Sequence, residues 1–350
     1  MKLSCTRRTI AVSALSVLFA VASGFAGAKP AHADSIELRF ADSFPLSHDL
    51  SKQGMVYWMK RAEELSGGAV KFTHYPAEQL VKARALFGAI SSGTVDAGYI
   101  ANGYFTDKLP LNGVADIPGV NSTSKHGSQA YWSLLNEEGL LRKEFLDGNV
   151  VPMAFIVMPP YQMVLRTGKV EKPESLRGLK IRSGGGIQNI TLSAVGATPV
   201  AMAAPEIYLG IQRGTLDGTL LAAISLNPYK LQEVAKSITR GIPFGSPAIG
   251  IGMNKTKFDA LPEAVRNALI KAGHETVAHL STYLDNQIAE AEKQLAASGM
   301  TVYDPSAETV SQINKQLETV AEDWAKRIRG RGLPADEVLK QFQERIQKVK

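Results

Sequence analysis

An arginine followed by a glycine-rich turn is the part of this sequence best suited to holding a small anion. Arg182 ends an apolar segment (179–182), and a serine and three glycines (183–186) separate it from a predicted helix at 187–195. A guanidinium can hold a carboxylate with two parallel hydrogen bonds, and the start of a helix offers N–H groups to an anion. The pattern predicts a carboxylate site, although a solvent-exposed arginine before a flexible turn fits the same spacing equally well.

Other patterns that would support catalysis are incomplete. The stretch 274–279 approaches the zinc motif H-E-x-x-H, but His274 and His279 are five residues apart. On a helix they would lie about 140° apart around the axis and could not share one metal ion. The sequence contains no P-loop, no G-x-G-x-x-G and no G-x-S-x-G. We therefore expect no metal, no cofactor and no enzyme activity; an enzyme with a scattered acid and base near Arg182 is the open alternative.

The N-terminus has the features of an export signal. Basic residues at positions 2, 7 and 8 precede an apolar run at 10–28, and Ala31-His32-Ala33 forms a small-x-small cleavage pattern. These features predict a signal peptide over 1–33, cleaved after Ala33, and a periplasmic protein with no stable membrane insertion after cleavage. An uncleaved anchor is the alternative, and the arginine pair leaves twin-arginine export open.

Cleavage would change the charge of the chain and remove its cysteine. The first 33 residues hold four basic residues and no acidic ones, so the formal net charge falls from +6 to +2. The pI of about 9.2 is largely a property of this segment, and we expect no binding to nucleic acid. Cys5, the only cysteine, is lost too, so the mature chain would contain no disulfide and no cysteine nucleophile.

The elements that must position Arg182 alternate between strand and helix. This alternation predicts an α/β fold in which helices flank sheets. Two of the strands, at 149–158 and 248–253, are expected to carry the chain between two lobes. The predicted strands lie at 36–41, 70–75, 149–158, 179–182 and 248–253, and the predicted helices at 47–65, 83–91, 187–195, 261–298 and 307–329.

A repeated turn indicates an internal duplication. Gly-Thr-Val-Asp (93–96) recurs as Gly-Thr-Leu-Asp (214–217), each time between a predicted helix and a short apolar run. Upstream of the second copy, the strand 179–182 takes the place that 70–75 takes upstream of the first. The repeat predicts two similarly built lobes, with chance similarity between two common turns as the alternative.

Several short segments together suggest a family, and they lie at 76–80, 92–96, 176–182, 195–200, 206–208, 212–218, 254–255 and 261–262. In this order they resemble the extracytoplasmic receptors of tripartite ATP-independent periplasmic (TRAP) transporters of the C4-dicarboxylate-binding, DctP type. The resemblance implies a two-lobed periplasmic binding protein-like fold, with crossing strands and a long helix that spans both lobes. It also implies that a ligand is enclosed as the lobes close, that Arg182 clamps its carboxylate, and that membrane permease subunits receive it.

The expected domain boundaries follow from this resemblance. We expect lobe I to comprise 34–158 plus 247–286 and lobe II to comprise 159–246 plus 287–350. A basic cluster at 326–331 is either a docking surface or a solvated helix end.

Departures from the family pattern bear on the ligand. Tyr161 stands where some members carry a second arginine, and Leu221 lies where sialic-acid binders place an asparagine. The acidic contact of those binders aligns near Asn102. Phe44 and Phe244, with Tyr161 and Leu221, are expected to face an apolar or aromatic tail, although each aromatic residue equally fits a lobe core. The expected ligand-binding residues are Arg182, Tyr161, Phe44, Asn102, Leu221 and Phe244.

Together these patterns predict an extracytoplasmic solute-binding receptor. It would capture a small organic acid, expected to be a monocarboxylate with an apolar or aromatic tail, and deliver it to a TRAP-type secondary transporter. Its expected partners are the carboxylate ligand and the membrane permease subunits. A C4-dicarboxylate binder and a sensory receptor of the same fold are the alternatives.

Overall fold

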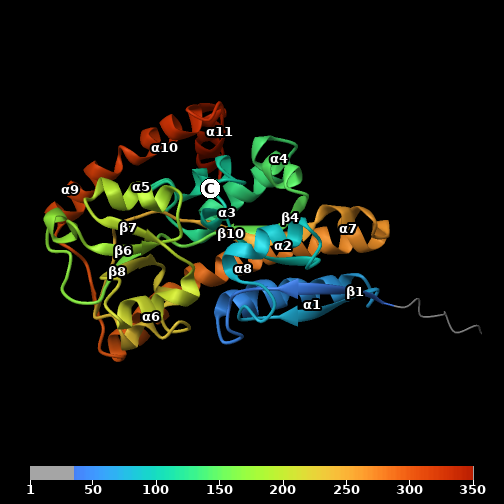
Figure 1. The fold of residues 1–350 in the computed structure, drawn as a ribbon, viewed down its shortest axis with the longest axis horizontal. Helices are drawn as coiled ribbons and strands as arrows, with labels where there is room; N and C mark the ends of the chain where they lie inside the picture. The colour runs from blue at the N-terminus through green and yellow to red at the C-terminus, as the bar shows by residue number, and fades with distance from the viewer. Residues whose placement is uncertain (1–34, 350) are drawn as a thin grey trace, which may run out of the picture. The chain divides into compact units, whose positions relative to one another are not determined.

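The computed structural model describes residues 35–349 and shows helices packed on two separate β-sheets (Figure 1). The predicted signal peptide and its cleavage site after Ala33 lie outside these residues. No helix within 35–349 is long and apolar enough to cross a membrane. The predicted α/β class is confirmed.

The first sheet has five strands in the order β2-β1-β3-β10-β4. β1 runs parallel to β2 and β3, whereas β10 runs antiparallel to β3 and β4. Every residue of β3, β4 and β10 is buried, which explains why these strands are continuous apolar runs in the sequence. The bounds are β1 Ile36–Ala41, β2 Val70–Tyr75, β3 Ala97–Ala101, β4 Val150–Val157 and β10 Ala248–Asn254.

The second sheet has six strands in the order β11-β9-β5-β8-β6-β7. β6 runs parallel to β7 and β8, β5 runs antiparallel to β8 and β9, and β11 is parallel to β9. The bounds are β5 Gln162–Leu165, β6 Lys180–Ser183, β7 Thr198–Ala201, β8 Gly218–Leu221, β9 Ser237–Thr239 and β11 Thr301–Tyr303.

The two sheets repeat one plan. The series β2-β1-β3-β10-β4 has the same parallel and antiparallel neighbours as the series β7-β6-β8-β5-β9. This agreement supports the predicted duplication, but it makes β1 the counterpart of β6. The predicted equivalence of 70–75 with 179–182 is therefore wrong, because β2 corresponds to β7 instead.

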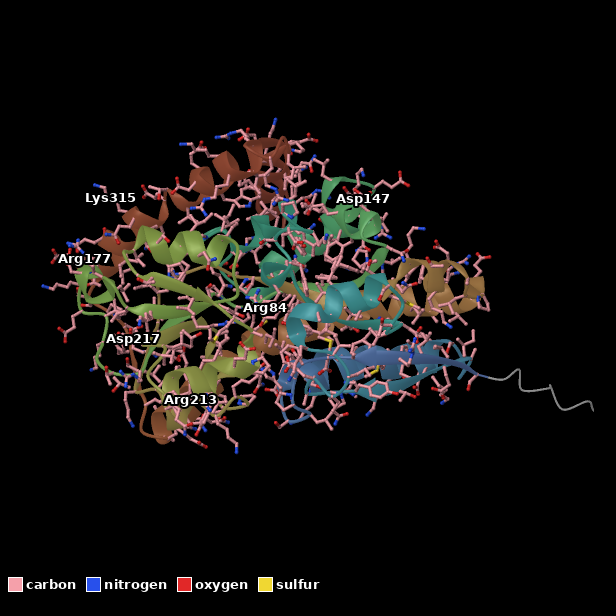
Figure 2. All side chains as sticks on the ribbon, in the orientation of Figure 1. Arg84, Asp147, Arg177, Arg213, Asp217 and Lys315 are labelled. Carbon is pink, nitrogen blue, oxygen red and sulfur yellow. The ribbon has the colours of Figure 1, made fainter. Side chains whose placement is uncertain are left out.

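The repeated turns make the same contacts in both sheets. The backbone N–H of Asp96 donates to the Arg39 carbonyl (3.0 Å), and its carboxylate accepts from the Arg39 N–H (2.7 Å). Asp217, labelled in Figure 2, makes the same pair of bonds with Lys180, at 2.8 and 2.9 Å. Each turn begins with a glycine in the left-handed region, at φ of +76° and +71°. The similarity of the two tetrapeptides thus reflects one structural role.

The helices confirm the longest sequence patterns and correct others. The predicted helix at 261–298 is α8, whereas the one expected at 307–329 is two helices, α9 and α10. The segment at 47–65 begins as a π-helical stretch, Leu50–Val56, before α1. The α-helices are α1 Tyr57–Leu65, α2 Leu86–Ser91, α3 Ser124–Asn136, α4 Leu140–Asp147, α5 Ile187–Ala194, α6 Ile207–Gln212, α7 Lys255–Asp259, α8 Glu263–Ala297, α9 Ala307–Leu317, α10 Val320–Arg329 and α11 Ala335–Lys348.

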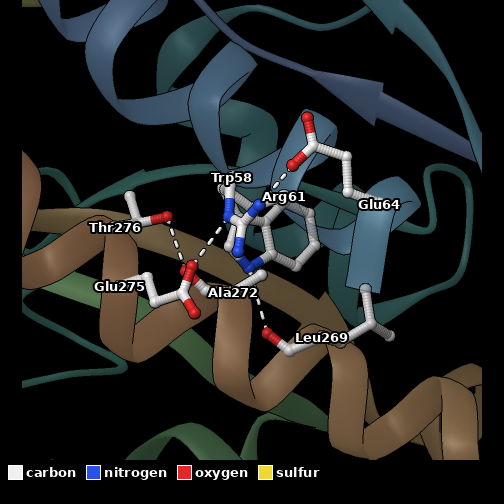
Figure 3. Close-up of polar contacts among 7 residues, drawn as sticks. All are labelled: Trp58, Arg61, Glu64, Leu269, Ala272, Glu275 and Thr276. Atoms are coloured by element: carbon white, nitrogen blue, oxygen red, sulfur yellow. Dashed lines mark hydrogen bonds and ion pairs between the residues drawn. The ribbon is translucent and has the colours of Figure 1, made fainter. Parts of the chain in front are cut away.

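Helix α8 contacts elements of both sheets. It packs against α1, α3 and β4 along one part of its length and against β11 near its end. Figure 3 shows how α1 is held: Trp58 Nε1 donates to the Leu269 carbonyl at 3.3 Å, and Arg61 Nε lies 2.7 Å from Glu275 Oε2. The Trp58 ring is fully buried, so this bond satisfies a polar group that water cannot reach.

The chain passes between the sheets through two short segments that pair with each other. We call residues 35–158 and 247–262, which contain the first sheet, the first half, and residues 159–246, which contain strands β5 to β9 of the second sheet, the second half. At the boundary, the Met158 N–H donates to the Pro247 carbonyl and the Tyr161 N–H to the Gly245 carbonyl. β4 and β10 themselves lie wholly within the first sheet, so the crossings follow β4 and precede β10. The predicted lobe boundaries stay a prediction. Helix α11, which that prediction assigns to lobe II, packs on α3 of the first half.

Candidate functional site

A cavity lies between the two halves, beyond the carboxyl ends of the parallel strands β1, β3, β6 and β8. This is where α/β folds place their ligands. Its free volume is about 30 Å³, roughly two to three times what one buried water needs. The lining residues are Phe44, His48, Leu50, Tyr99, Ala101, Gly103, Tyr104, Tyr161, Arg182, Gly184, Gln188, Ala204, Leu221, Ser225, Tyr229, Pro247 and Ile249.

Arg182 lies in β6 with its side chain at this cavity, and only 3% of the residue is exposed. The alternative of a solvent-exposed arginine is therefore wrong. Its Nε donates to the Met202 carbonyl (2.9 Å), and its Nη2 donates to the Tyr104 hydroxyl (3.2 Å). Among residues 35–349 these are its hydrogen bonds, and Nη1 has no partner there. In this arrangement the two bonds fix the plane of the guanidinium.

The glycine turn after Arg182 has a different role from the one expected. The N–H of Gly184 donates to the Gln188 side chain at 2.7 Å, and the N–H of Gly185 donates to Ser183 Oγ at 3.2 Å. These donors are therefore occupied within the chain. Gly185 has φ +107°, and a Cβ there would lie 2.6 Å from the Gly103 carbonyl oxygen. The glycine thus lets the two halves approach closely.

Tyr104 joins the two halves at Arg182, and it is not among the predicted site residues. It ends a short 3₁₀ helix, Asn102–Tyr104, of the first half. Its hydroxyl accepts hydrogen bonds from Arg182 Nη2 and from the Ala204 N–H (2.9 Å), both in the second half. With both lone pairs used, the hydroxyl hydrogen remains available to a ligand oxygen. Arg84, labelled in Figure 2, stacks over the Tyr104 ring at 5.1 Å and donates to the Gly184 carbonyl.

Four of the six predicted site residues line the cavity: Arg182, Phe44, Tyr161 and Leu221. Phe44 lies after β1 and packs edge-on against Tyr99, with ring centroids 4.5 Å apart. Leu221 is the last residue of β8, and Tyr161 lies in the segment that crosses between the halves. The structure therefore brings these residues together, and their contact with a ligand stays a prediction.

The other two predicted residues are placed elsewhere in the described chain. Asn102 is buried, and its amide donates to the Tyr131 hydroxyl (2.6 Å) and to the Asn112 carbonyl (3.4 Å) within the first half. Phe244 is fully buried beside the crossing, where its N–H donates to the Tyr161 carbonyl. Neither is among the residues that line the cavity.

Besides Tyr104, the cavity contains polar residues that the sequence analysis did not select. His48, Gln188, Ser225 and Tyr229 line it together with Tyr99. In the structure β1 is the counterpart of β6, and the loop after β1, which holds His48, lies at the same cavity as the loop that follows Arg182. The sequence repeat matched β6 with 70–75 instead, so it gave no indication of His48.

The cavity carries one full charge among its described lining residues, that of Arg182. Burial lowers the pKa of His48 to about 3, with Lys52 nearby adding to the effect, so His48 is neutral. Burial also raises the pKa of the Tyr99 and Tyr229 hydroxyls, which stay protonated. Behind the lining, burial holds the pKa of the Asp116 carboxyl well above its usual range. Among the described lining residues, the site therefore presents one cation beside neutral side chains.

The two histidines of the incomplete zinc motif contact different partners. His274 Nδ1 accepts from Trp132 Nε1 at 3.1 Å, whereas His279 Nε2 lies 2.9 Å from the Gln53 amide oxygen. Residues 35–349 contain no group of three or more histidine or carboxylate side chains placed to hold a metal ion.

Comparisons with known proteins identify the family. Residues 42–327 match the DctP family, described as "Bacterial extracellular solute-binding protein, family 7". A protein named "Solute-binding protein" from Albidiferax ferrireducens is 28% identical over 215 residues, which cover 61% of this chain and 63% of that protein. The alignment thus spans less than two thirds of that relative.

Solved structures share the fold. A TRAP solute-binding protein from Rhodoferax ferrireducens, in complex with copurified benzoate, has a TM-score of 0.84 at 23% identity and covers 90% of this chain and 98% of its own. A TRAP periplasmic solute-binding protein from Bordetella bronchiseptica, with bound (R)- and (S)-mandelate, has a TM-score of 0.81 at 22% identity, covering 90% and 100%. Because the family match spans most of the described residues, the chain belongs to the DctP family of bacterial extracellular solute-binding proteins, as its sequence motifs predicted.

Proposed function

We propose that this protein is an extracytoplasmic receptor that binds a small organic monocarboxylate in the cavity and delivers it to the permease of a TRAP transporter. It would act in the periplasm after cleavage of its signal peptide. One observation carries the proposal: Arg182 is buried at the cavity, is oriented by two hydrogen bonds, and has Nη1 without a partner among residues 35–349.

The electrostatics of the cavity favour an anion with a single charge. A buried guanidinium without a counter-ion is costly, and a carboxylate would neutralise it through strong charge-assisted hydrogen bonds. A second carboxylate would enter surroundings that supply no second cation among the described lining residues. A monocarboxylate is therefore favoured over a dicarboxylate.

The remaining walls suit an apolar or aromatic part of the ligand. Phe44, Tyr161 and Leu221 are nearly fully buried and line the cavity with Ile249. These apolar walls favour a ring or an alkyl group over a sugar acid, whose several hydroxyls would need polar partners. The benzoate and mandelate bound by the two similar structures each carry an aromatic ring and support the choice.

Closure of two lobes around the ligand would complete the site. We propose that lobe I (34–158 plus 247–286) and lobe II (159–246 plus 287–350) separate to admit the acid and close on it. Tyr104 supports this mechanism, because its hydroxyl joins Arg182 and Ala204 across the halves. The closed form would be the one that the permease recognises. We propose binding without catalysis, since no acid and base pair flanks Arg182 among the described lining residues.

A thermal-shift and calorimetry experiment tests the function. The purified protein is unfolded and refolded to remove any copurified acid, then titrated with aromatic, aliphatic, 2-oxo and 2-hydroxy monocarboxylates, and with dicarboxylates and sugar acids. A ligand that binds only the folded state raises the melting temperature with its concentration. Arg182→Ala should abolish the rise, whereas Arg177→Ala, which removes an exposed arginine (Figure 2), should leave it intact.

Three outcomes would contradict parts of the proposal. Normal binding by Arg182→Ala would remove the carboxylate clamp. A response confined to dicarboxylates or sugar acids would refute the monocarboxylate assignment while leaving the receptor role. Conversion of the bound acid to a product, seen by chromatography, would refute a purely binding function.

A further inference from the structure

A second polar group of side chains lines the cavity, separate from Arg182. His48 follows β1 in the first half and is fully buried, and Tyr229 belongs to the second half. Their rings meet edge-on with centroids 5.1 Å apart. Both His48 Nε2 and the Tyr229 hydroxyl are sealed from solvent and have no hydrogen-bond partner within residues 35–349. Such groups are rare in folded proteins, because each has given up its bonds to water.

The geometry fixes the chemical character of His48. Its Nδ1 accepts a hydrogen bond from the Leu50 N–H at 3.1 Å, so in the neutral ring the proton lies on Nε2. Burial lowers the pKa of His48 to about 3, and Lys52 acts in the same direction. The groups that pack on the ring, Phe44 and Tyr229, carry no charge at neutral pH. His48 Nε2 is therefore a neutral donor that needs an acceptor.

We propose that His48 and Tyr229 form an oxygen-binding subsite that selects hydroxy- or oxo-substituted monocarboxylates over their unsubstituted parents. The ligand's hydroxyl or carbonyl oxygen would accept from His48 Nε2 and pair with the Tyr229 hydroxyl, while its carboxylate binds Arg182. A second carboxylate fits this subsite less well, because both donors are neutral. The inference rests on the proposed function and specifies its ligand class.

The subsite also depends on both halves. His48 comes from the loop after β1, and Tyr229 comes from the segment between β8 and β9. A ligand oxygen held between them is therefore bound only while the halves are together. Its contribution should be visible in the dissociation rate as well as in the affinity.

The test compares acids that differ by one oxygen. Calorimetry measures Kd for phenylacetate against mandelate and phenylglyoxylate, and for benzoate against 3-hydroxybenzoate. For at least one pair, we expect the oxygenated acid to bind wild-type protein about tenfold more tightly, equivalent to about 1.4 kcal/mol. Tyr229→Phe and His48→Phe should each bring that ratio close to one. Tyr57→Phe, whose ring stacks on His279 away from the cavity lining, is the matched control.

The results separate this inference from the proposed function. Equal binding of both members of every pair by wild-type protein would overturn the subsite and leave the carboxylate receptor intact. A preference that persists in both variants would also overturn it. If His48→Phe does not fold, Tyr229→Phe, which removes one oxygen atom, decides alone. Failure of the wild-type protein to bind any acid would refute the proposed function, and the subsite with it.

Discussion

Removing the Tyr104 hydroxyl is the sharpest test of how the two halves hold Arg182. In Tyr104→Phe the ring and its contact with Arg84 remain, and one oxygen is lost. That oxygen accepts from Arg182 Nη2 at 3.2 Å and from the Ala204 N–H at 2.9 Å. Both donors belong to the second half, so the substitution weakens the joined state of the halves and the preorganisation of the carboxylate site.

The magnitude follows from these two bonds. A hydrogen bond to a charged group contributes about 1.5–3 kcal/mol and a neutral one about 0.5–1.5 kcal/mol. A bound carboxylate and entering water would compensate for part of the loss. We therefore expect a net weakening of about 1.5–3 kcal/mol, which corresponds to a rise of roughly 10- to 100-fold in Kd.

A matched control uses the same chemical change elsewhere in the first half. The Tyr131 hydroxyl accepts from the Asn102 amide at 2.6 Å and donates to Asn112, so it also has two partners. Both partners lie in the first half. Tyr131→Phe should therefore lower the melting temperature by several degrees, at about 2–4 °C per kcal/mol, and change Kd by less than about threefold.

Calorimetry with a monocarboxylate found in the initial screen measures both variants, and small-angle scattering follows any closure on ligand addition. Tyr104→Phe should bind weakly and stay expanded at ligand concentrations that saturate wild-type protein. Wild-type affinity in Tyr104→Phe would refute the reasoning, since the bond to Arg182 would then contribute nothing to binding. Equal loss of affinity in Tyr131→Phe would show that general destabilisation causes the effect.

Three further predictions concern stability. Gly273→Ala should lower the free energy of unfolding by about 1–3 kcal/mol or more in urea titrations, because a Cβ there would lie 1.9 Å from the Met153 carbonyl oxygen. Gly88→Ala is the control: a Cβ there meets no atom within 4 Å, so this substitution should be neutral or stabilising. The pKa of His48 is lower in the native state (about 3) than in the unfolded chain (about 6.5). As the pH falls below about 6.5, the unfolded chain takes up a proton at this histidine, so the free energy of unfolding decreases, by about 2 kcal/mol at pH 5. His48→Phe should remove this pH dependence from urea titrations. The raised pKa of Asp116 has the opposite consequence. As the pH rises above about 4, the unfolded chain loses the proton of this carboxyl more readily than the native state does, so the free energy of unfolding decreases. Asp116→Asn should therefore be more stable than wild-type protein in urea titrations at pH 8.

Local patterns predicted the parts of the site that depend on one strand and the turn after it. Arg182 follows an apolar strand segment and precedes glycines, a position at which α/β folds place ligands, although the spacing alone fitted an exposed arginine equally well. The repeated Asp turns were recognisable for the same reason: each aspartate binds the backbone of the neighbouring parallel strand. The repeat alone did not determine the order of the strands. The prediction therefore matched β2 with β6, whereas the structure matches β1 with β6.

The residues that were misplaced depend on contacts between distant segments. Asn102 and Tyr104 are two positions apart in one 3₁₀ turn, yet Asn102 bonds to Tyr131 in the first half and Tyr104 reaches the second half. Nothing in the local spacing distinguishes these directions. Phe244 and Tyr161 are likewise neighbours across the crossing, and the structure places only Tyr161 at the cavity.

The arrangement around Arg182 suggests why closure would depend on the ligand. In separated lobes the guanidinium could keep water; in the closed arrangement it is 3% exposed, and the protein supplies it with two acceptors, neither of them charged. Removing a cation from water costs several kcal/mol, and neutral acceptors return only part of this. A carboxylate on Nη1 would supply the rest, so an empty receptor should favour the open state and an occupied one the closed state. On this mechanism the buried charge of Arg182 would both bind the ligand and determine which state the permease recognises.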